Sequence, residues 1–204
     1  MTRFALPVLA LGIALALPGA ASAQVASHEP SQVQAGTYAV DPAHTQVGFG
    51  VSHMGFTTYY GHFADASGTL ELTPKNPAGS RLTVSVPTAS VSTTSEKLDG
   101  ELKGDQWFDA AKYPTITFAS TQITPTGHGE AKVTGNLTMH GVTKPVTFDA
   151  KFVGAGTNPL DKKYTVGFAI TGTVSRSEFG VKTYVPLIGD EVAITISGAF
   201  EKQG

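Results

Sequence analysis

Apolar and polar residues alternate along most of this 204-residue chain. Val47, Phe49 and Val51 alternate with small or polar residues, and the longest run of this kind extends from Tyr164 to Val174. Alternation with a period of two places successive side chains on opposite faces of a β-strand. The pattern therefore predicts a series of half-buried strands. Similar runs lie at 63–72, 82–86, 116–123, 133–139, 146–152 and 192–200.

The connections between these runs are short and contain turn residues. Glycines lie in the segments 126–129 and 140–141, and Asn158-Pro159 lies in the longer connection at 154–161. Hairpin-length connections without crossover helices favour an antiparallel sandwich or barrel and exclude a parallel α/β sheet. Closure into a barrel is favoured because it removes exposed strand edges. The aromatic-rich segment 53–61 is predicted to be a loop, and Gly68 to be a bulge or bend.

One segment, from Lys97 to Phe118, interrupts the strands with a helical pattern. Thr93 and Glu96 fit a capping box, and a short helical segment is predicted over about residues 94–109. Leu98 and Leu102 are four residues apart and share one face of such a helix. Two functions remain open for this segment: it closes the end of a barrel or covers a sheet edge, or it gates a ligand through the aromatic pair Trp107 and Phe108.

The N-terminus has the features of an export signal. Arg3 precedes an apolar run from Phe4 to Leu17, and Ala21-Ser22-Ala23 is an A-x-A cleavage site. Residues 1–23 are therefore predicted to be a cleaved signal peptide, and the mature protein is expected to be exported. Residues 24–35 are expected to form a mobile lead-in, and 36–204 a single domain. The chain contains no cysteine, which excludes disulfides, cysteine-ligated metals and a cysteine nucleophile.

The charge balance limits the partners. Lys and Arg total 14 against 16 Asp and Glu, which excludes a strongly basic nucleic-acid surface. There is no polybasic run for anionic lipid and no later apolar run of spanning length, so stable membrane insertion is not expected. The sequence leaves the oligomeric state undecided, and a homodimer stays open.

Motifs for catalysis or metal binding are scarce. No two histidines have the i, i+4 spacing of a zinc-protease helix, and no serine lies in a G-x-S-x-G elbow. His53 and His62 flank the aromatic segment and could together hold a metal ion, although ordinary loop or rim histidines are favoured. Arg176 and Glu178 suggest an ion pair at a strand end, and Arg176 alternatively contacts a polar ligand head. We predict no catalytic residues, no metal and no cofactor.

Several short motifs resemble those of the YceI-like family, in the same order along the chain. The resemblance extends from about residue 36 to residue 200, nearly the whole mature chain. It rests on Asp41 and His44 before Val47 and Phe49, His53 to Gly55, Gly61 to Phe63, Leu98-Asp99, Trp107 to Asp109, Tyr113 to Phe118, Gly135 to Thr143, Ser175 to Gly180 and Gly189 to Val192. The resemblance implies an all-β fold, an extended lipocalin-like antiparallel barrel with eight strands. It also implies a long apolar lumen that binds a polyisoprenoid or another lipid chain.

The residues themselves are compatible with that function. An eight-stranded barrel is about wide enough to be filled by its own side chains or to hold one small ligand. Inward glycines such as Gly135, Gly172 and Gly198 leave space or let a strand bend. Each inward apolar residue is either plain core or ligand contact, because both share one surface in this fold. The residues expected at the lumen or its mouth are Phe49, Val51, Phe56, Trp107, Phe108, Ile116, Phe118, Leu137, Met139, Phe168, Ile170, Phe179 and Ile194, with His53 and Arg176 at a polar head.

The predicted function is therefore a periplasmic binding or carrier protein without enzymatic activity. Its expected ligand is a polyisoprenoid, an isoprenoid quinone or a fatty-acid-like lipid. Two alternatives remain: an enzyme acting on a quinone-like ligand through His53 or Arg176, and a structural or stress-response barrel with a filled lumen.

Overall fold

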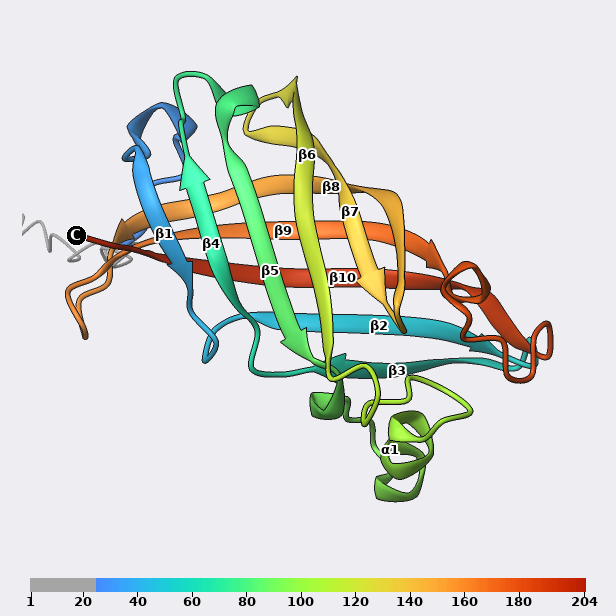
Figure 1. Cartoon of the computed structure of the whole chain (residues 1–204). Coiled ribbons are helices and arrows are strands. Elements are labelled where there is room, and N and C mark those ends of the chain that lie inside the picture. Colours follow the sequence, from blue (N-terminus) through green and yellow to red (C-terminus); the bar gives the residue numbers. More distant parts are fainter. Residues whose placement is uncertain (1–24) are drawn as a thin grey trace, which may run out of the picture.

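The computed structural model describes residues 25–204 as one sheet with a helix beside it (Figure 1). The predicted signal peptide, residues 1–23, lies outside the described residues. The strands are β1 (Gly36–Val40), β2 (Gln46–His53), β3 (Thr57–Phe63), β4 (Ser67–Leu72), β5 (Arg81–Pro87), β6 (Thr115–Gly127), β7 (Glu130–Met139), β8 (Val142–Thr157), β9 (Tyr164–Ser175) and β10 (Ile188–Lys202). The helices are α1 (Glu96–Lys103) and the short 3-10 turns η1 (Pro30–Gln32), η2 (Pro77–Gly79), η3 (Thr88–Ser90) and η4 (Arg176–Phe179). Among these described helices, none is both long enough and apolar enough to cross a bilayer.

Eight of the strands close into a barrel. The order is β1-β4-β5-β6-β7-β8-β9-β10, and β1 pairs with β10 to complete the ring, with Tyr38 opposite Lys202. All pairings are antiparallel, and the predicted eight-stranded antiparallel barrel is confirmed. Strands β2 and β3 form a hairpin that continues the wall from β10, with Val51 opposite Val192. In Figure 1 the wall of β4 to β7 crosses the wall of β8 to β10 steeply, as expected for strongly tilted strands.

The prediction of a loop at 53–61 is wrong. Only Met54 to Phe56 form a turn, in which Met54 and Gly55 have positive φ, and β3 starts at Thr57. The segment alternates like any strand, but Tyr60 on its outer face is exposed, and a cluster of exposed aromatic residues is also typical of a loop. Thr and Tyr favour strands on either face, so their exposure does not argue against one. The expected strand at 63–72 likewise begins later, at Ser67.

A glycine is required at residue 68 for a steric reason, and it does not form the predicted bulge. The pairing of β4 with β5 runs through Gly68 and Val84 without a register shift. Gly68 has φ +147°, a region essentially restricted to glycine, and a Cβ there would collide with the carbonyl oxygen of Thr83. The glycine therefore permits a close approach of β4 to β5.

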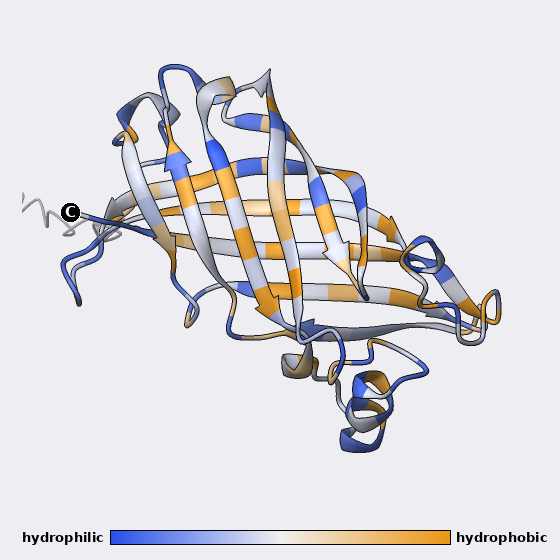
Figure 2. Cartoon of the chain, in the orientation of Figure 1, coloured by the Kyte–Doolittle hydropathy of each residue, from blue (hydrophilic) through white to orange (hydrophobic). Residues whose placement is uncertain are grey.

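Strand faces separate by polarity, as the alternating colours in Figure 2 show. Buried apolar residues such as Leu70, Val133 and Val166 face inward. Threonines on the outer face of β7 and β8 form cross-strand pairs, with 2.8 Å between the Thr134 and Thr147 hydroxyl oxygens. Such pairs are typical of a wetted sheet face.

The predicted helix exists but is shorter and capped by a different residue. It ends at Lys103 before the C-cap Gly104, and the aromatic residues Trp107 and Phe108 lie in the irregular segment that follows. Ser95, not Thr93, is the N-cap: its hydroxyl accepts a hydrogen bond from the Leu98 N–H at 3.3 Å. Thr93 instead donates its backbone N–H and its hydroxyl to Asp99, at 2.7 and 2.6 Å. Asp99 thus attaches the first turns of α1 to the preceding segment.

Acidification is expected to weaken this attachment. The hydroxyl hydrogen bond from Thr93 is the main cause that lowers the pKa of Asp99 below its ordinary value of 3.8. A carboxylate with a lowered folded pKa stabilises the fold above the unfolded pKa, and this contribution is lost as the pH falls. The thermal midpoint of the wild type should therefore exceed that of Asp99→Asn at neutral pH. The gap should shrink as the pH falls from about 4 to 3; a constant gap over this range contradicts the assignment.

Candidate functional site

The barrel encloses a long apolar cavity of about 530 Å³, which we call the lumen. This volume lies within the range of small-molecule sites. Phe168 and Ile170 of β9 line it, whereas Ala169 and Thr171 are exposed on the outer face, as their alternation predicts. The other predicted residues that line the lumen are Phe49, Val51, Trp107, Phe108, Ile116, Phe118, Leu137, Met139, Ile194 and Arg176.

Three predicted site residues do not line the lumen. Phe56 is 84% exposed in the β2–β3 turn, which extends beyond the closed part of the barrel. Phe179 is 1% exposed and packs in the apolar core at η4, behind the lumen wall. His53 is half-buried, with its ring centroid 6.4 Å from that of Tyr59. Their aromatic character suggested ligand contact, but side-chain type does not tell which end of a strand is inside the barrel.

Other lumen residues come from segments that the sequence analysis did not assign. Pro30 and Val33 belong to the expected lead-in, Pro74 and Pro77 to the connection around η2, and His128 to the β6–β7 turn. Irregular segments have no period from which an inward face can be inferred.

Phenylalanine rings pack directly over several inward-facing glycines, in space that a side chain would otherwise fill; we call these positions glycine seats. A Cβ at Gly172 would come within 2.5 Å of the Phe148 ring, and one at Gly61 would collide with the Phe49 ring. Gly135 holds the ring of Phe118 in the same way. The rings lie against the wall because no side chain occupies these positions, and the centre of the barrel stays hollow.

The two ends of the lumen differ in exposure. At one end the lining residues Pro77, Pro125, Gly127 and Glu130 are exposed, and we call this the open end. At the other, the lining residues Leu102, Val181 and Ile188 are buried, and we call this the closed end. Figure 1 places η2 and the β6–β7 turn at the top and α1 at the bottom, on opposite sides of the barrel.

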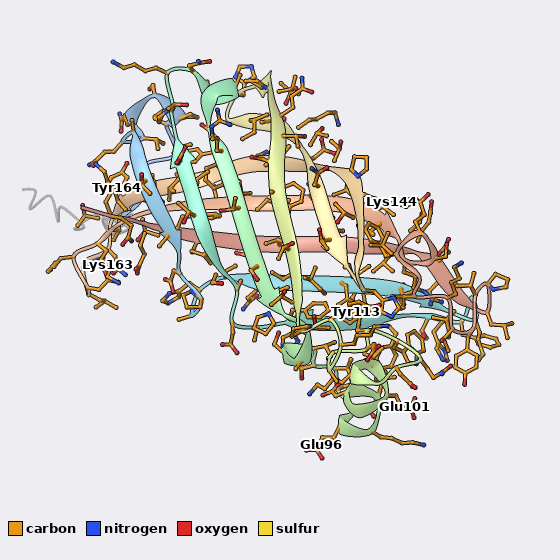
Figure 3. All side chains as sticks on the ribbon, viewed as in Figure 1. Glu96, Glu101, Tyr113, Lys144, Lys163 and Tyr164 are labelled. Atoms are coloured by element: carbon orange, nitrogen blue, oxygen red, sulfur yellow. The ribbon has the colours of Figure 1, made fainter. Side chains whose placement is uncertain are left out.

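The lead-in packs around the open end. The backbones of Ser27 and Ala155 exchange two hydrogen bonds, at 2.8 and 2.9 Å. The Tyr38 hydroxyl donates to the Gln34 carbonyl at 2.7 Å, and the Tyr164 hydroxyl lies 3.4 Å from the Gln34 N–H. Figure 3 labels Tyr164 beside the start of β1. The expected lead-in thus has defined partners on the barrel rim.

The closed end is built around Trp107 and Arg176. The Arg176 guanidinium carbon lies 5.4 Å from the centroid of the Trp107 ring, and the Tyr184 ring packs edge-on against Trp107 at 6.2 Å. Phe108 packs edge-on against Phe63 at 5.5 Å. The segment after α1 therefore closes the barrel, which is one of the two functions expected for it.

Arg176 does not form the ion pair with Glu178 that was expected. Its guanidinium donates to the carbonyls of Gly189, Val181 and Ile188 at 2.8, 3.0 and 2.8 Å. Glu178 lies instead 3.8 Å from the ammonium of Lys144, which is labelled in Figure 3. Burial lowers the pKa of Arg176, and the charge of Asp190 opposes this shift.

His53 and His62, the alternative candidates for a metal site, do not lie close enough to share an ion. His53 pairs with Thr57, whereas His62 pairs with Gly48, so the two histidines lie five positions apart on opposite faces of the β2–β3 hairpin. Five positions along a strand correspond to about 17 Å. Within residues 25–204 no group of three His, Asp or Glu side chains is placed to hold a metal ion.

The model of the YceI-like domain family matches residues 38–200. The chain belongs to this family. Protein YceI of Escherichia coli O157:H7 is 38% identical to this YceI-like chain over 154 residues, which are 76% of this chain and 80% of that protein. The crystal structure of BcnA from Burkholderia cenocepacia has a TM-score of 0.71 and 27% identity, covering 78% of this chain and 98% of that one. A polyisoprenoid binding domain from Saccharophagus degradans shares the fold, with a TM-score of 0.62, 14% identity, and coverage of 83% and 100%.

Several YceI-like motif residues maintain turns. Asp41 accepts hydrogen bonds from the N–H groups of Ala43 and His44, and its second oxygen lies 2.5 Å from His44 Nδ1. Asp190 accepts both the N–H and the hydroxyl of Ser177, each at 2.8 Å. These YceI-like motifs fix the geometry at the ends of strands, and the lumen wall consists largely of less distinctive apolar residues.

Proposed function

We propose that this protein binds the chain of a polyisoprenoid or another long apolar lipid in its lumen. The observation that carries the proposal is the continuous apolar wall around a hollow of about 530 Å³. Each buried CH₂-sized group contributes about 0.8 kcal/mol, so a long chain binds tightly without polar contacts. The fold shared with a polyisoprenoid binding domain gives further support.

The alternatives fit the geometry less well. A structural barrel with a filled lumen conflicts with the glycine seats, which keep the rings of Phe49, Phe118 and Phe148 against the wall. An enzyme acting through His53 or Arg176 finds no support, because His53 does not line the lumen and Arg176 donates to backbone carbonyls. Isoprenoid quinones and fatty-acid-like lipids remain within the proposed ligand class.

Native mass spectrometry tests the proposal directly. The protein purified without detergent should carry an added mass, which solvent extraction should release as an apolar chain. A fully empty protein that also fails to take up added farnesol contradicts lipid binding. Chemical turnover of a bound chain, with release of a changed product, supports the enzyme instead.

We further propose that the protein acts as a lipid carrier in the periplasm. Support comes from the sequence pattern of residues 1–23, with its apolar run and A-x-A site. N-terminal sequencing of the protein from the exported fraction should begin at Gln24. Mature protein that retains Met1 contradicts cleavage, and its recovery only from the cytosol contradicts export.

A further inference from the structure

The lumen carries formal charge at two of its described lining residues, and these lie at opposite ends. Glu130 lines the open end, where the Lys151 ammonium lies 3.3 Å from its carboxylate. Arg176 lines the closed end and is 5% exposed. Charges interact strongly in an apolar surrounding because little water screens them. Glu130 is exposed to water and paired with Lys151, whereas Arg176 is buried, so the charge of Arg176 is the less screened of the two and favours an anion at the closed end.

Arg176 retains hydrogen-bonding capacity. A guanidinium has five N–H donors, and three of them are used by backbone carbonyls. None of the ion pairs in the described part of the chain includes Arg176. The nearby Asp190 uses its oxygens to accept from Ser177. Arg176 thus lines the lumen as a buried cation, and the hydrogen bonds of the described residues use three of its five N–H donors.

We propose that the closed end binds the anionic head group, a carboxylate or a phosphate, of a long-chain amphiphile whose tail extends towards the open end. This inference rests on the proposed function of the lumen. A guanidinium suits both anions because its planar donors match their oxygens. The opposite orientation places the anion beside Glu130 and leaves Arg176 facing hydrocarbon.

The only tryptophan of the chain reports this orientation, because Trp107 lies against Arg176. Bromine quenches tryptophan fluorescence on contact, so its position on a ligand chain can be detected. The delipidated protein is titrated with 2-bromohexadecanoate and with 16-bromohexadecanoate, and calorimetry measures the binding of each. The 2-bromo acid should quench strongly and the 16-bromo acid weakly.

Each other outcome overturns the inference. Stronger quenching by the 16-bromo acid means that the tail occupies the closed end. Equal quenching means that there is no fixed orientation, and binding without quenching means that the ligand does not reach Trp107. If neither acid nor farnesol binds in calorimetry, the proposed function itself fails and this inference fails with it.

A second comparison isolates the contribution of the charge. Hexadecanoate should bind about tenfold or more tightly than hexadecanol, because hydrogen bonds to charged groups are stronger than neutral ones. The affinities of farnesyl phosphate and farnesol give the same comparison for phosphate, and the pair with the larger affinity ratio identifies the preferred anion.

In Arg176→Gln both affinity ratios should fall to about one. The variant should still bind hexadecanol, which also verifies that it is folded. Ratios near one in the wild type, or an unchanged ratio in folded Arg176→Gln, contradict the assignment; if Arg176→Gln does not fold, the wild-type ratios decide alone.

Discussion

Ile170→Arg is expected to abolish lipid binding. Ile170 lies on the inward face of β9, between Ile196 of β10 and Ala150 of β8, and all three residues line the lumen. An arginine at this position brings an unpaired charge into an apolar cavity, which costs several kcal/mol. The variant should lose its co-purified lipid in native mass spectrometry, and its free energy of unfolding should fall by a similar amount.

The neighbouring residue provides the matched control. Thr171 is on the same strand but faces solvent, so Thr171→Arg should retain the lipid and change stability by no more than about 0.5 kcal/mol. Ile170→Ser separates loss of binding from unfolding, because it adds polarity to the wall without a charge. If folded Ile170→Arg retains its lipid as fully as Thr171→Arg does, the ligand is bound outside the lumen.

Gly68→Ala is expected to destabilise the barrel severely. The new methyl group would meet the Thr83 carbonyl oxygen, and the backbone of Gly68 has φ +147°, a conformation that costs other residues about 1–3 kcal/mol. Because Thr83 belongs to the adjacent strand β5, relief requires separation of β4 from β5. Urea denaturation should show a loss of at least about 2–3 kcal/mol in the free energy of unfolding.

The same substitution in α1 should have the opposite sign. Gly100 is exposed, and a Cβ there has no neighbouring atom within 4 Å. Gly100→Ala should stabilise the protein by up to about 1 kcal/mol, because alanine favours a helix over glycine. Equal urea midpoints for the two variants are incompatible with a steric role of Gly68.

The alternation of apolar residues predicted antiparallel strands, favoured their closure and indicated the inward face of β9, and the resemblance to the YceI-like family implied the eight-stranded barrel. Phe168 and Ile170 line the lumen. Side chains of a strand alternate between its two faces, so assigning Thr171 to the solvent face places both of them on the inward face. Segment 57–63 was missed because Tyr60 lies on the outer face of β3, where aromatic exposure resembles that of a loop. The Thr and Tyr residues of this segment, which favour strands, were therefore a better guide than the assumption that clustered aromatic residues belong to a loop.

The ends of the lumen could not be predicted from the sequence. Trp107 and Arg176 meet only because α1 and η4 lie at the same end of the closed barrel, and no local pattern relates them. The N-cap was placed at Thr93 because the spacing to Glu96 fitted a capping box, whereas Ser95 is the residue with the required extended backbone. Such details depend on tertiary contacts that decide which of several suitable hydroxyls caps the helix.

The seat that Gly172 provides for Phe148 has a consequence for the divergence of such barrels. The ring of residue 148 occupies the space left by the missing side chain of residue 172 on the adjacent strand. The two positions therefore determine the width of the lumen jointly. A larger residue at 172 would force the ring of residue 148 into the lumen, unless residue 148 becomes smaller at the same time. Selection for a bulkier or slimmer cargo should therefore act on the two positions as a covarying pair, with no change in strand number or backbone course.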